Sequence, residues 1–524
     1  MKNFELQLSR PLPIGIQSFE KLRRENFVYV DKTAFVYRLA KTPTPYFLSR
    51  PRRFGKSLLL STLEAYFLGK RELFKGLAIE QLETEWATHA VLHLDLNAEK
   101  YDSPGRLHDM LEFQLRGWEE IYGTGGLGIT HSARFMEVIR KAYEKTGRGV
   151  VVLIDEYDKP LLRSFHDEKL QQAFRETLTA FYTVLKDADP WLRFVFITGV
   201  TKFAQMGIFS NLNQLNDISF DREYAAICGM TLREIEDNFE PEITCMVETL
   251  GKTHEEIMNE MTRLYDGYHF TEPPTDGMFN PFSVLNALSK KTFRNYWFAS
   301  GTPTFLVEIL KKTHFDLRAL DSIEVSAASL SDDRADINNP VPMIYQSGYL
   351  TIKKYDEEFQ TYTLGFPNEE VKYGFLNFAA PFYTPVQESD TSFYIGKFTR
   401  ELREGDVDAF LTRLRAFFAG IPYELNDQTE RHYQVIFYLV FRLMGQFSEA
   451  EVKSTRGRAD SVVKTAGYIY VFEFKLNGSA EEALAQIDDR GYLVPYTVDG
   501  RQLVKVGVEF DRQQRNIGRW IKAI

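Results

Sequence analysis

The sequence predicts an α/β protein in which a parallel sheet comes first and a second, smaller α/β domain comes last. Three observations support this class. A Gly-Lys-Ser triplet at residues 55–57 separates an extended apolar run from a leucine-rich helical run. Two apolar, mostly β-branched or aromatic runs, residues 149–154 and 193–197, end in polar residues, as buried parallel strands do. Near the C-terminus, two short strands carry acidic residues and a lysine within residues 460–475.

The Gly-Lys-Ser triplet has the residue types of a phosphate-binding loop. Such a loop offers backbone N–H groups to phosphate oxygens, a lysine to the terminal phosphates and a hydroxyl to Mg²⁺. Gly55, Lys56 and Ser57 supply these groups. The remaining predicted ATP-binding residues of the segment are Arg52, Arg53, Phe54 and Leu58. The usual pattern has a glycine where this chain has Arg50, so the loop alone leaves open an ordinary helix N-terminus with a solvated lysine.

The run at residues 149–154 supplies the second half of a predicted ATP site. It ends in Asp155 and Glu156, and carboxylates at the carboxyl end of a parallel strand lie where open α/β sheets bind ligands. Asp155 is therefore the predicted magnesium ligand beside Ser57, and Glu156 is the candidate base for an attacking water. The alternative is an acidic first helical turn. Thr198 ends the next buried run and is a candidate sensor of the terminal phosphate, unless its hydroxyl merely finishes a strand.

The C-terminal residues predict a second, metal-dependent site. Residues 457–463 and 468–475 read as two strands joined by a turn. Since strand side chains alternate, Glu473 and Lys475 lie together at the end of an apolar face, and Asp460 on the neighbouring strand completes the set. Two carboxylates suit Mg²⁺ or Mn²⁺, and a lysine can orient the metal-bound water for phosphodiester hydrolysis. The alternative is an exposed cross-strand charge pair.

Several motifs together resemble the AAA-ATPase-like family of bacterial proteins, in which an ATPase domain is followed by a C-terminal PD-(D/E)XK nuclease domain. The resemblance extends over nearly the whole chain, and Arg50 in place of glycine is usual for the family. The motifs are residues 29–33, 50–57, 155–158, 208–213, 265–270, 280–283 and 348–351, with Asp460, Glu473 and Lys475. The proline that precedes the first aspartate in many such nucleases is Ala459 here.

The resemblance adds residues to the predicted nuclease site. Similar nucleases place an acidic metal ligand, or a group that orients one, where Glu430 opens a predicted helix. Gln486 and Tyr492 resemble the family's glutamine and tyrosine positions and are expected to contact nucleic acid. From the sequence itself, Arg456 and Arg458 form a basic cluster before Asp460 that could meet a phosphate backbone. For each of these positions, an ordinary solvated or capping role is the alternative.

Composition limits the class and location of the protein. The 524 residues, 44% of them hydrophobic, are enough for several cores. We expect an ATPase domain at 1–229, a helical lid at 230–324, a linker and mixed connecting region at 325–420, and a nuclease-like domain at 421–524. Two cysteines and no apolar leader or membrane span predict a cytoplasmic protein. A homo-oligomer is left open.

The net charge of −10 argues against a chain that coats nucleic acid without specificity. The C-terminal domain, however, has equal numbers of basic and acidic residues, so the acidity lies elsewhere. We therefore expect an ATP- and Mg²⁺-dependent protein whose nuclease domain cuts nucleic acid, DNA in preference to RNA, with ATP gating cleavage. By analogy alone, such a pairing fits defence against phage or mobile DNA. The alternative is a nucleotide-dependent switch or assembly module whose nuclease-like domain binds nucleic acid without cutting it.

Overall fold

The computed structural model describes residues 10–126, 130–202, 208–209, 212, 214–272, 276–298, 306, 310, 315–331, 339–384, 388–420, 430–445, 449–451, 461–475, 478–511, 513–514 and 516–524. Side chains are described for all of these except residues 388–390, 392, 430–434 and 449–451. The chain divides into two compact units. The first comprises Met1–Ile309 and Ser322–Val371, and the second comprises Leu310–Asp321 and Lys372–Ile524.

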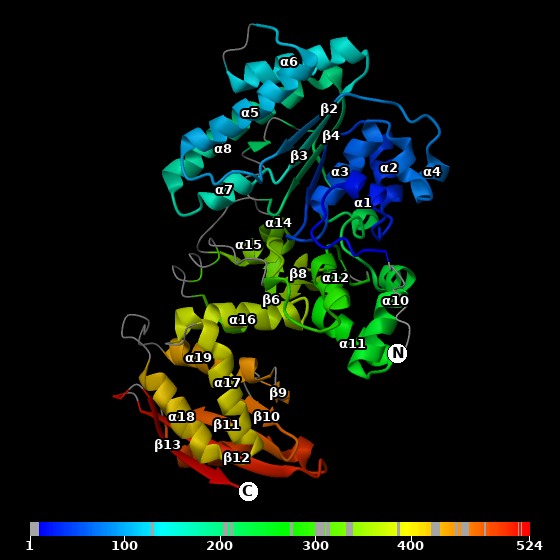
Figure 1. Cartoon of the computed structure of the whole chain (residues 1–524). Helices are drawn as coiled ribbons and strands as arrows, with labels where there is room; N and C mark the ends of the chain where they lie inside the picture. Colours follow the sequence, from blue (N-terminus) through cyan, green and yellow to red (C-terminus); the bar gives the residue numbers. More distant parts are fainter. Residues whose placement is uncertain are drawn as a thin grey trace. The chain divides into compact units, whose positions relative to one another are not determined.

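A five-stranded parallel sheet lies between helices in the N-terminal part of the first unit (Figure 1). Its strand order is β2-β3-β4-β1-β5, and every neighbouring pair is parallel. Strand β4 therefore lies between β1 and β3, the strands that lead into the predicted phosphate loop and the acidic motif. This arrangement confirms the predicted class. The strands are β1 (Tyr46–Ser49), β2 (Val91–Asp95), β3 (Val150–Asp155), β4 (Leu192–Gly199) and β5 (Asn216–Asp217).

Helices cover both faces of this sheet, which explains why β1 and β3 are apolar along their length. Figure 1 shows α5 (Pro104–Tyr122), α6 (His131–Thr146) and α8 (Glu168–Asp187) together on one side. Val150, Val152 and Ile154 pack with the apolar stripes of these helices. On the other side lie α1 (Phe19–Arg24), α2 (Thr33–Lys41), α3 (Lys56–Phe67) and α4 (Ala78–Leu82). Short helical segments are η1 (Arg71–Phe74), α7 (Lys159–Arg163), η2 (Asp189–Trp191) and η3 (Arg222–Tyr224).

A helical segment follows the sheet, in α10 (Leu232–Leu250), α11 (His254–Tyr265) and α12 (Pro281–Lys290). Capping boxes begin α10 and α11, with Thr231 and Thr253 each accepting a hydrogen bond from the third helical N–H. Asn280 caps α12, with Pro281 at its first position. The apolar faces of the three helices form one core with Val28. No helix among the described residues is long and apolar enough to span a membrane.

The rest of the first unit contains a small antiparallel sheet of order β6-β8-β7. Its strands are β6 (Ile323–Ser326), β7 (Thr351–Asp356) and β8 (Thr361–Gly365), accompanied by α14 (Ala327–Ser331) and α15 (Val341–Gln346). The segment η5 (Leu317–Asp321) belongs to the second unit. Helix α16 (Glu369–Tyr383) begins in the first unit and continues into the second. The predicted boundaries at 229/230, 324/325 and 420/421 stay predictions.

The second unit is built on a mixed sheet of order β13-β12-β11-β10-β9. Only β11 and β12 are parallel, and α20 makes the crossover between them. The aromatic face of β11 packs on α18 and α19, with Phe472 against Phe410 and Phe441. The elements are α17 (Glu388–Arg403), α18 (Val407–Ala419), α19 (Glu430–Met444), β9 (Glu449–Glu451), β10 (Ser461–Lys464), β11 (Tyr468–Lys475), α20 (Ala480–Asp489), η7 (Val494–Tyr496), β12 (Gln502–Asp511) and β13 (Asn516–Ala523).

Candidate active sites

The segment between β1 and α3 has the geometry of a phosphate-binding loop. Helix α3 begins at Lys56, directly after Gly55, whose φ of 94° lies in the left-handed region that glycine adopts without strain. The first backbone N–H groups of α3 have no partners within the helix and are available to oxygen acceptors. Lys56 is buried, and its Nζ donates to the carbonyl oxygens of Arg50 at 3.0 Å and Pro51 at 3.2 Å. The loop therefore wraps around the amine predicted to bind phosphate.

Arg50, which takes the place of the usual glycine, stabilises the loop through hydrogen bonds to backbone carbonyls. Its guanidinium donates to the carbonyl oxygens of Ser49 at 2.9 Å, Ser219 at 2.8 Å and Tyr224 at 3.1 Å. It also lies 4.2 Å from the ring centroid of Phe270. Burial lowers the pKa of this fully enclosed guanidinium. Arg50 thus connects the end of β1 to the segment after β5. It does not line the cavity that lies over the loop and the acidic motif.

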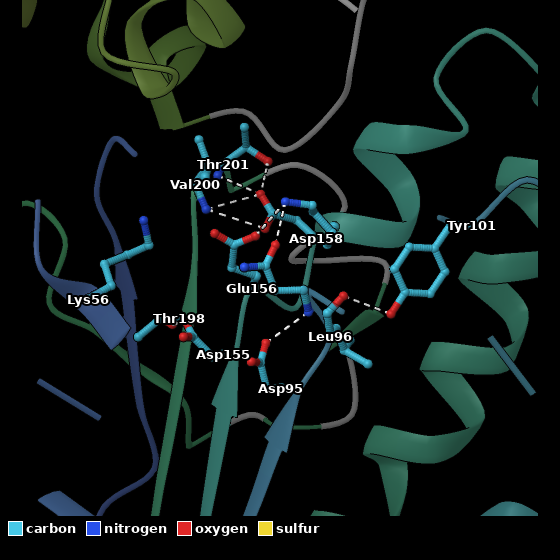
Figure 2. A network of polar contacts seen from close by, with 12 residues as sticks. Lys56, Asp95, Leu96, Tyr101, Asp155, Glu156, Asp158, Thr198, Val200 and Thr201 are labelled. Atoms are coloured by element: carbon cyan, nitrogen blue, oxygen red, sulfur yellow. Dashed lines mark hydrogen bonds and ion pairs between the residues drawn. The ribbon is translucent and has the colours of Figure 1, made fainter. Parts of the chain in front are cut away.

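The carboxyl ends of β2, β3 and β4 bring polar side chains together beside the loop (Figure 2). Asp155 ends β3 and is buried, and its Oδ1 accepts a 2.7 Å hydrogen bond from Thr198 Oγ1 on β4. This contact orients the carboxylate, whereas the predicted contact of Thr198 with an attacking water stays a prediction. Asp95 lies opposite Asp155 in the register of β2 and β3. Burial raises the pKa of Asp95, which the sequence analysis did not single out.

Glu156, the candidate base, is held by a lysine one turn later. Its φ of 50° is left-handed, a strained conformation for a residue other than glycine and one that often marks functional sites. Lys159 Nζ lies 2.9 Å from Glu156 Oε2 and donates to Asn97 Oδ1 at 2.7 Å. Burial alone would raise the pKa of Glu156, but the charges of Lys56 and Lys159, with Arg52, hold it below its ordinary value. Glu156 is therefore ionised at neutral pH.

Asp158 fixes the backbone of the acidic motif to the end of β4. Its buried carboxylate accepts from the backbone N–H groups of Val200 and Thr201 and from the Thr201 hydroxyl, the last two at 2.7 Å (Figure 2). Burial raises the pKa of Asp158. In the opposite direction, the backbone N–H of Tyr157 donates to the Thr198 carbonyl at 3.0 Å. The two strands are thus joined at the point where Glu156 emerges.

A cavity of about 410 Å³ lies over the loop and the acidic motif. This volume suits a small-molecule ligand. The predicted residues that line it are Arg52, Arg53, Phe54, Gly55, Lys56, Ser57, Leu58 and Glu156, whereas Asp155 and Thr198 are not among its lining residues. Further polar residues of the wall are Lys32, Asn97, Lys159 and Arg163. The apolar residues that line the cavity include Ile16, Val28, Tyr29, Ile227, Met230, Phe239, Phe282 and Leu285.

The additional residues come from segments far from the loop in sequence, so no local motif marks them. Lys32 is an example, because its Nζ pairs with Glu234 of α10 at 2.6 Å while it lines the cavity. Burial lowers the pKa of Lys32. The resemblance motifs at 29–33 and 280–283 include Lys32 and Phe282, but they indicated no role for these residues.

Later segments of the first unit enclose the loop. Phe54 is buried against Tyr268, with ring centroids 4.7 Å apart. Trp297 Nε1 donates to the Arg52 carbonyl at 3.2 Å. Gly348 has a φ of +88°, and a Cβ there would lie 2.6 Å from Pro51 Cβ. Tyr268 and Gly348, from the resemblance motifs at 265–270 and 348–351, therefore lie directly against the phosphate loop.

The second candidate site lies at the end of β11. Glu473 is buried, and Lys475 is half-buried with its Nζ 3.9 Å from Glu473 Oε1. Gln486 of α20 bridges the two, because its Nε2 donates to Glu473 and its Oε1 accepts from Lys475 Nζ. The alternation predicted for β11 is confirmed, since Ile469 and Val471 pack with Ile487 of α20.

Gly507 allows α20 to approach this site. It lies opposite Glu473 in the parallel pairing of β11 and β12. A Cβ at Gly507 would clash with the carbonyl oxygen of Ala480 and lie 2.7 Å from the backbone N of Leu484. The backbone of α20 thus lies directly on β12, which brings Gln486 to Glu473. No sequence signal near the Glu-x-Lys motif indicated this glycine.

Several predicted nuclease residues cannot be placed. Asp460, Arg456 and Arg458 lie outside the described residues, and the side chain of Glu430 is not described, although α19 begins there as predicted. Ser461, which follows Asp460, pairs with Phe472, which precedes Glu473. Tyr492 packs against the Ile469, Val471 and Ile487 cluster. The nucleic-acid contacts of Gln486 and Tyr492 stay predictions.

The oxygen atoms of the described side chains suit hard divalent cations at both sites. Beside the phosphate loop, Ser57 is the second residue of α3, and Asp155 offers a carboxylate already oriented by Thr198. At the second site, the Glu473 carboxylate is held by Gln486 beside a lysine. Such oxygen ligands are those that Mg²⁺ and Mn²⁺ prefer. Within the described parts of the chain, no group of three His, Cys, Asp or Glu side chains forms a ready metal centre.

Comparison with known proteins identifies the families of two parts of the chain. Residues 13–209 match the AAA-ATPase-like family, described as "Predicted AAA-ATPase", and residues 428–520 match the PD-(D/E)XK nuclease superfamily. A protein of Azotobacter chroococcum mcd 1, described as "Uncharacterized protein in vnfD 5'region", is 35% identical over 523 residues. That match covers 97% of this chain and 98% of the other protein. The chain therefore belongs to the AAA-ATPase-like family, with a PD-(D/E)XK nuclease domain at its C-terminal end.

Proposed function

We propose that the chain is a magnesium-dependent ATPase whose nucleotide state controls a metal-dependent nuclease domain. The observation that supports it most is the cavity over the phosphate loop, whose lining combines Lys56, Ser57 and Glu156 with apolar side chains. The cations and the helical N–H groups of this lining suit a triphosphate. Its apolar residues suit a nucleobase. Together these features fit ATP better than a small anion.

For ATP hydrolysis, the residues divide into binding and proton-transfer roles. Lys56 and the first N–H groups of α3 bind the phosphates, and Ser57 with Asp155 would hold the metal. Mg²⁺ bound there would neutralise charge that develops on the phosphates. Glu156, ionised at neutral pH, accepts the proton of the attacking water. Thr198 holds the Asp155 carboxylate in place through its hydrogen bond.

For nucleic-acid cleavage, we assign the metal to Glu473 and Asp460, with Glu430 as a further ligand or orienting group. A divalent metal there would lower the pKa of a bound water and neutralise phosphate charge. Lys475 would orient that water, and Gln486 holds both Glu473 and Lys475 in place. DNA is the preferred substrate in this proposal, with Arg456 and Arg458 on its backbone. A cytoplasmic role in defence against phage or mobile DNA rests on the pairing of the two domains alone.

Gating by ATP is supported by contacts that lead away from the phosphate loop. Trp297 donates its indole N–H to the Arg52 carbonyl, and its backbone N–H donates to the Glu370 carboxylate at 2.8 Å. Glu370 also accepts from the Ser283 hydroxyl at 2.7 Å. It lies in the first turn of α16, the helix that continues into the second unit. A nucleotide that shifts the loop therefore acts on the start of a helix shared by both units.

The test is incubation of the purified chain with DNA or RNA, Mg²⁺ or Mn²⁺, and ATP, a non-hydrolysable ATP analogue or no nucleotide. We expect cleavage that needs metal, changes with nucleotide and is lost in Glu473→Gln, because the amide keeps the size but loses the ligand charge. Glu481→Gln, an exposed change in α20, is the matched control and should cut normally. Glu156→Gln should still bind ATP but hydrolyse it about 10²- to 10⁴-fold more slowly.

Two results would change the proposal. Cleavage that persists in Glu473→Gln would place the activity in another site or a contaminant. Metal-dependent binding of nucleic acid without cleavage, under every nucleotide condition, would favour the alternative of a nucleotide-dependent binding or assembly module. In that case the ATPase assignment would still stand if Glu156→Gln slows hydrolysis.

A further inference from the structure

Lys159 bridges two residues that face the nucleotide cavity from different strands. It is the first residue of α7, and its Nζ lies 2.9 Å from Glu156 Oε2 and 2.7 Å from Asn97 Oδ1. Asn97 follows β2, whereas Glu156 follows β3. The side chains of Lys159 and Glu156 are 19% and 16% exposed, so solvent screens this pair only partly. All three residues line the cavity with Lys56.

The backbone of Glu156 is fixed on both sides, which leaves its side chain as the part that needs restraint. Tyr157 N–H donates to the Thr198 carbonyl, and the Asp158 carboxylate accepts from Thr201. The left-handed φ at Glu156 persists only because such neighbours enforce it. The Lys159 N–H also donates to the Glu156 carbonyl at 2.9 Å. These contacts define where the Glu156 side chain begins, but only Lys159 is described as bonding its carboxylate.

Lys56 is the competing partner for that carboxylate. It lines the same cavity and attracts Glu156 electrostatically. A carboxylate paired with Lys56 would occupy the amine that the phosphates need and would point the base away from a water. Lys56 instead bonds the carbonyl oxygens of Arg50 and Pro51 in this structure. Lys159 therefore gives the Glu156 carboxylate a partner other than Lys56, while the Lys56 amine bonds the loop carbonyls.

We propose that Lys159 is the positioning residue for the base, holding the Glu156 carboxylate away from Lys56 through a bridge anchored on Asn97. This inference rests on the proposed ATPase function, with Glu156 as the base. It assigns Lys159 no contact with the reacting atoms. Lys56 and the loop bind the substrate phosphates.

The experiment compares steady-state ATP hydrolysis and ATP affinity of Lys159→Met, Lys159→Arg and Asn97→Ala in the full chain. Lys159→Met should lower kcat about 10- to 100-fold, because small misplacements of a reacting group have effects of this size. The Kd for ATP should stay within about twofold, since the phosphate ligands are untouched. Lys159→Arg should lie closer to the wild type than Lys159→Met does. The matched control is Lys169→Met, an exposed lysine of α8 without a described side-chain partner, and it should change neither quantity.

Asn97→Ala keeps Lys159 and tests the same bridge if Lys159→Met does not fold. It should lower kcat less than Lys159→Met, and the double variant should be no slower than Lys159→Met alone, because both changes break one bridge. A weakened ATP affinity with kcat retained would make Lys159 a phosphate ligand and overturn the proposal. An increased or unchanged kcat in Lys159→Met, or an arginine variant as slow as the methionine variant, would also overturn it. Full activity of Glu156→Gln would instead refute the proposed base, a separately measured failure.

Discussion

Glu370→Gln tests how a buried carboxylate is accommodated at the start of α16. Glu370 is 1% exposed and accepts hydrogen bonds from the Ser283 hydroxyl and from the backbone N–H groups of Tyr296 and Trp297. The described titratable groups that interact with it are tyrosines, which are uncharged below about pH 10. They are Tyr265, Tyr268 and Tyr296. Burial, which the hydrogen bonds only partly offset, raises the pKa of Glu370 from 4.5 to about 7.

The sign and size of the effect follow from this pKa. Between pH 4.5 and about 7, the folded chain keeps a proton on Glu370 that the unfolded chain has lost. The free energy of unfolding therefore falls as pH rises through this window and levels off above it. A difference of about 2.5 pKa units corresponds to about 3 kcal/mol. Glutamine is neutral at every pH and keeps an acceptor oxygen. The free energy of unfolding of the variant should therefore not fall as pH rises through this window.

The measurement is the free energy of unfolding of Glu370→Gln and of the wild type at pH 5 and at pH 8. It is obtained by chemical denaturation, from the transition in which the first unit unfolds. The two proteins should be similar at pH 5, and the variant should be more stable at pH 8 by up to about 3 kcal/mol. Glu369→Gln is the control, because this neighbouring carboxylate pairs with Arg263 and is partly exposed. An equal difference at both pH values, or a variant less stable at pH 8, would refute the reasoning.

Three further predictions concern the two sites. Arg50→Gly restores the usual loop glycine but removes the described donor to the buried carbonyl of Ser219, whereas the Tyr224 carbonyl keeps the Ile227 N–H at 3.2 Å. We expect a loss of about 1 to 3 kcal/mol in the free energy of unfolding by chemical denaturation, and no measurable loss would contradict a supporting role. Lys56→Ala should abolish tight ATP binding, measured by calorimetry, with little change in melting temperature; unchanged affinity in the folded variant would remove the phosphate-loop assignment. Gly507→Ala should push α20 off β12 and reduce nucleic-acid cleavage at least about tenfold. ATP hydrolysis without nucleic acid should stay normal. Normal cleavage would show that Gln486 need not bridge Glu473 and Lys475.

The parts of the fold that the sequence predicted correctly are those with local signals. The order of strand, Gly-Lys-Ser and helix, and the apolar run that ends in Asp155, lie within short stretches whose periodicity and end residues suffice. Alternation alone predicted that Glu473 shares a face of β11 with Ile469 and Val471, and the structure shows that this face packs on α20. These signals need no knowledge of which segments meet in space.

The parts that could not be predicted depend on contacts between distant residues. Arg50 interrupts the usual loop pattern, and its partners at Ser219, Tyr224 and Phe270 are about 170 to 220 positions away. Lys159 reads as an ordinary lysine after the acidic motif until the fold brings Asn97 beside it. Gly507 is one glycine in a strand, and only the packing of α20 explains it. In each case tertiary structure, not local propensity, decides the role.

The enclosure of the phosphate loop by later segments has a consequence for synthesis on the ribosome. Lys56 is made early, but Trp297 and Gly348, which contact the loop, follow roughly 240 and 290 residues later. At about 5 to 20 residues per second, the loop waits on the order of 15 to 60 s for its last described neighbours. A nascent chain that ends at residue 229 would contain Gly55, Lys56, Ser57, Asp155 and Glu156. It would still lack Trp297 and Gly348, which contact the loop. The capacity to bind ATP should therefore arise late in translation, when nearly the whole first unit has left the ribosome.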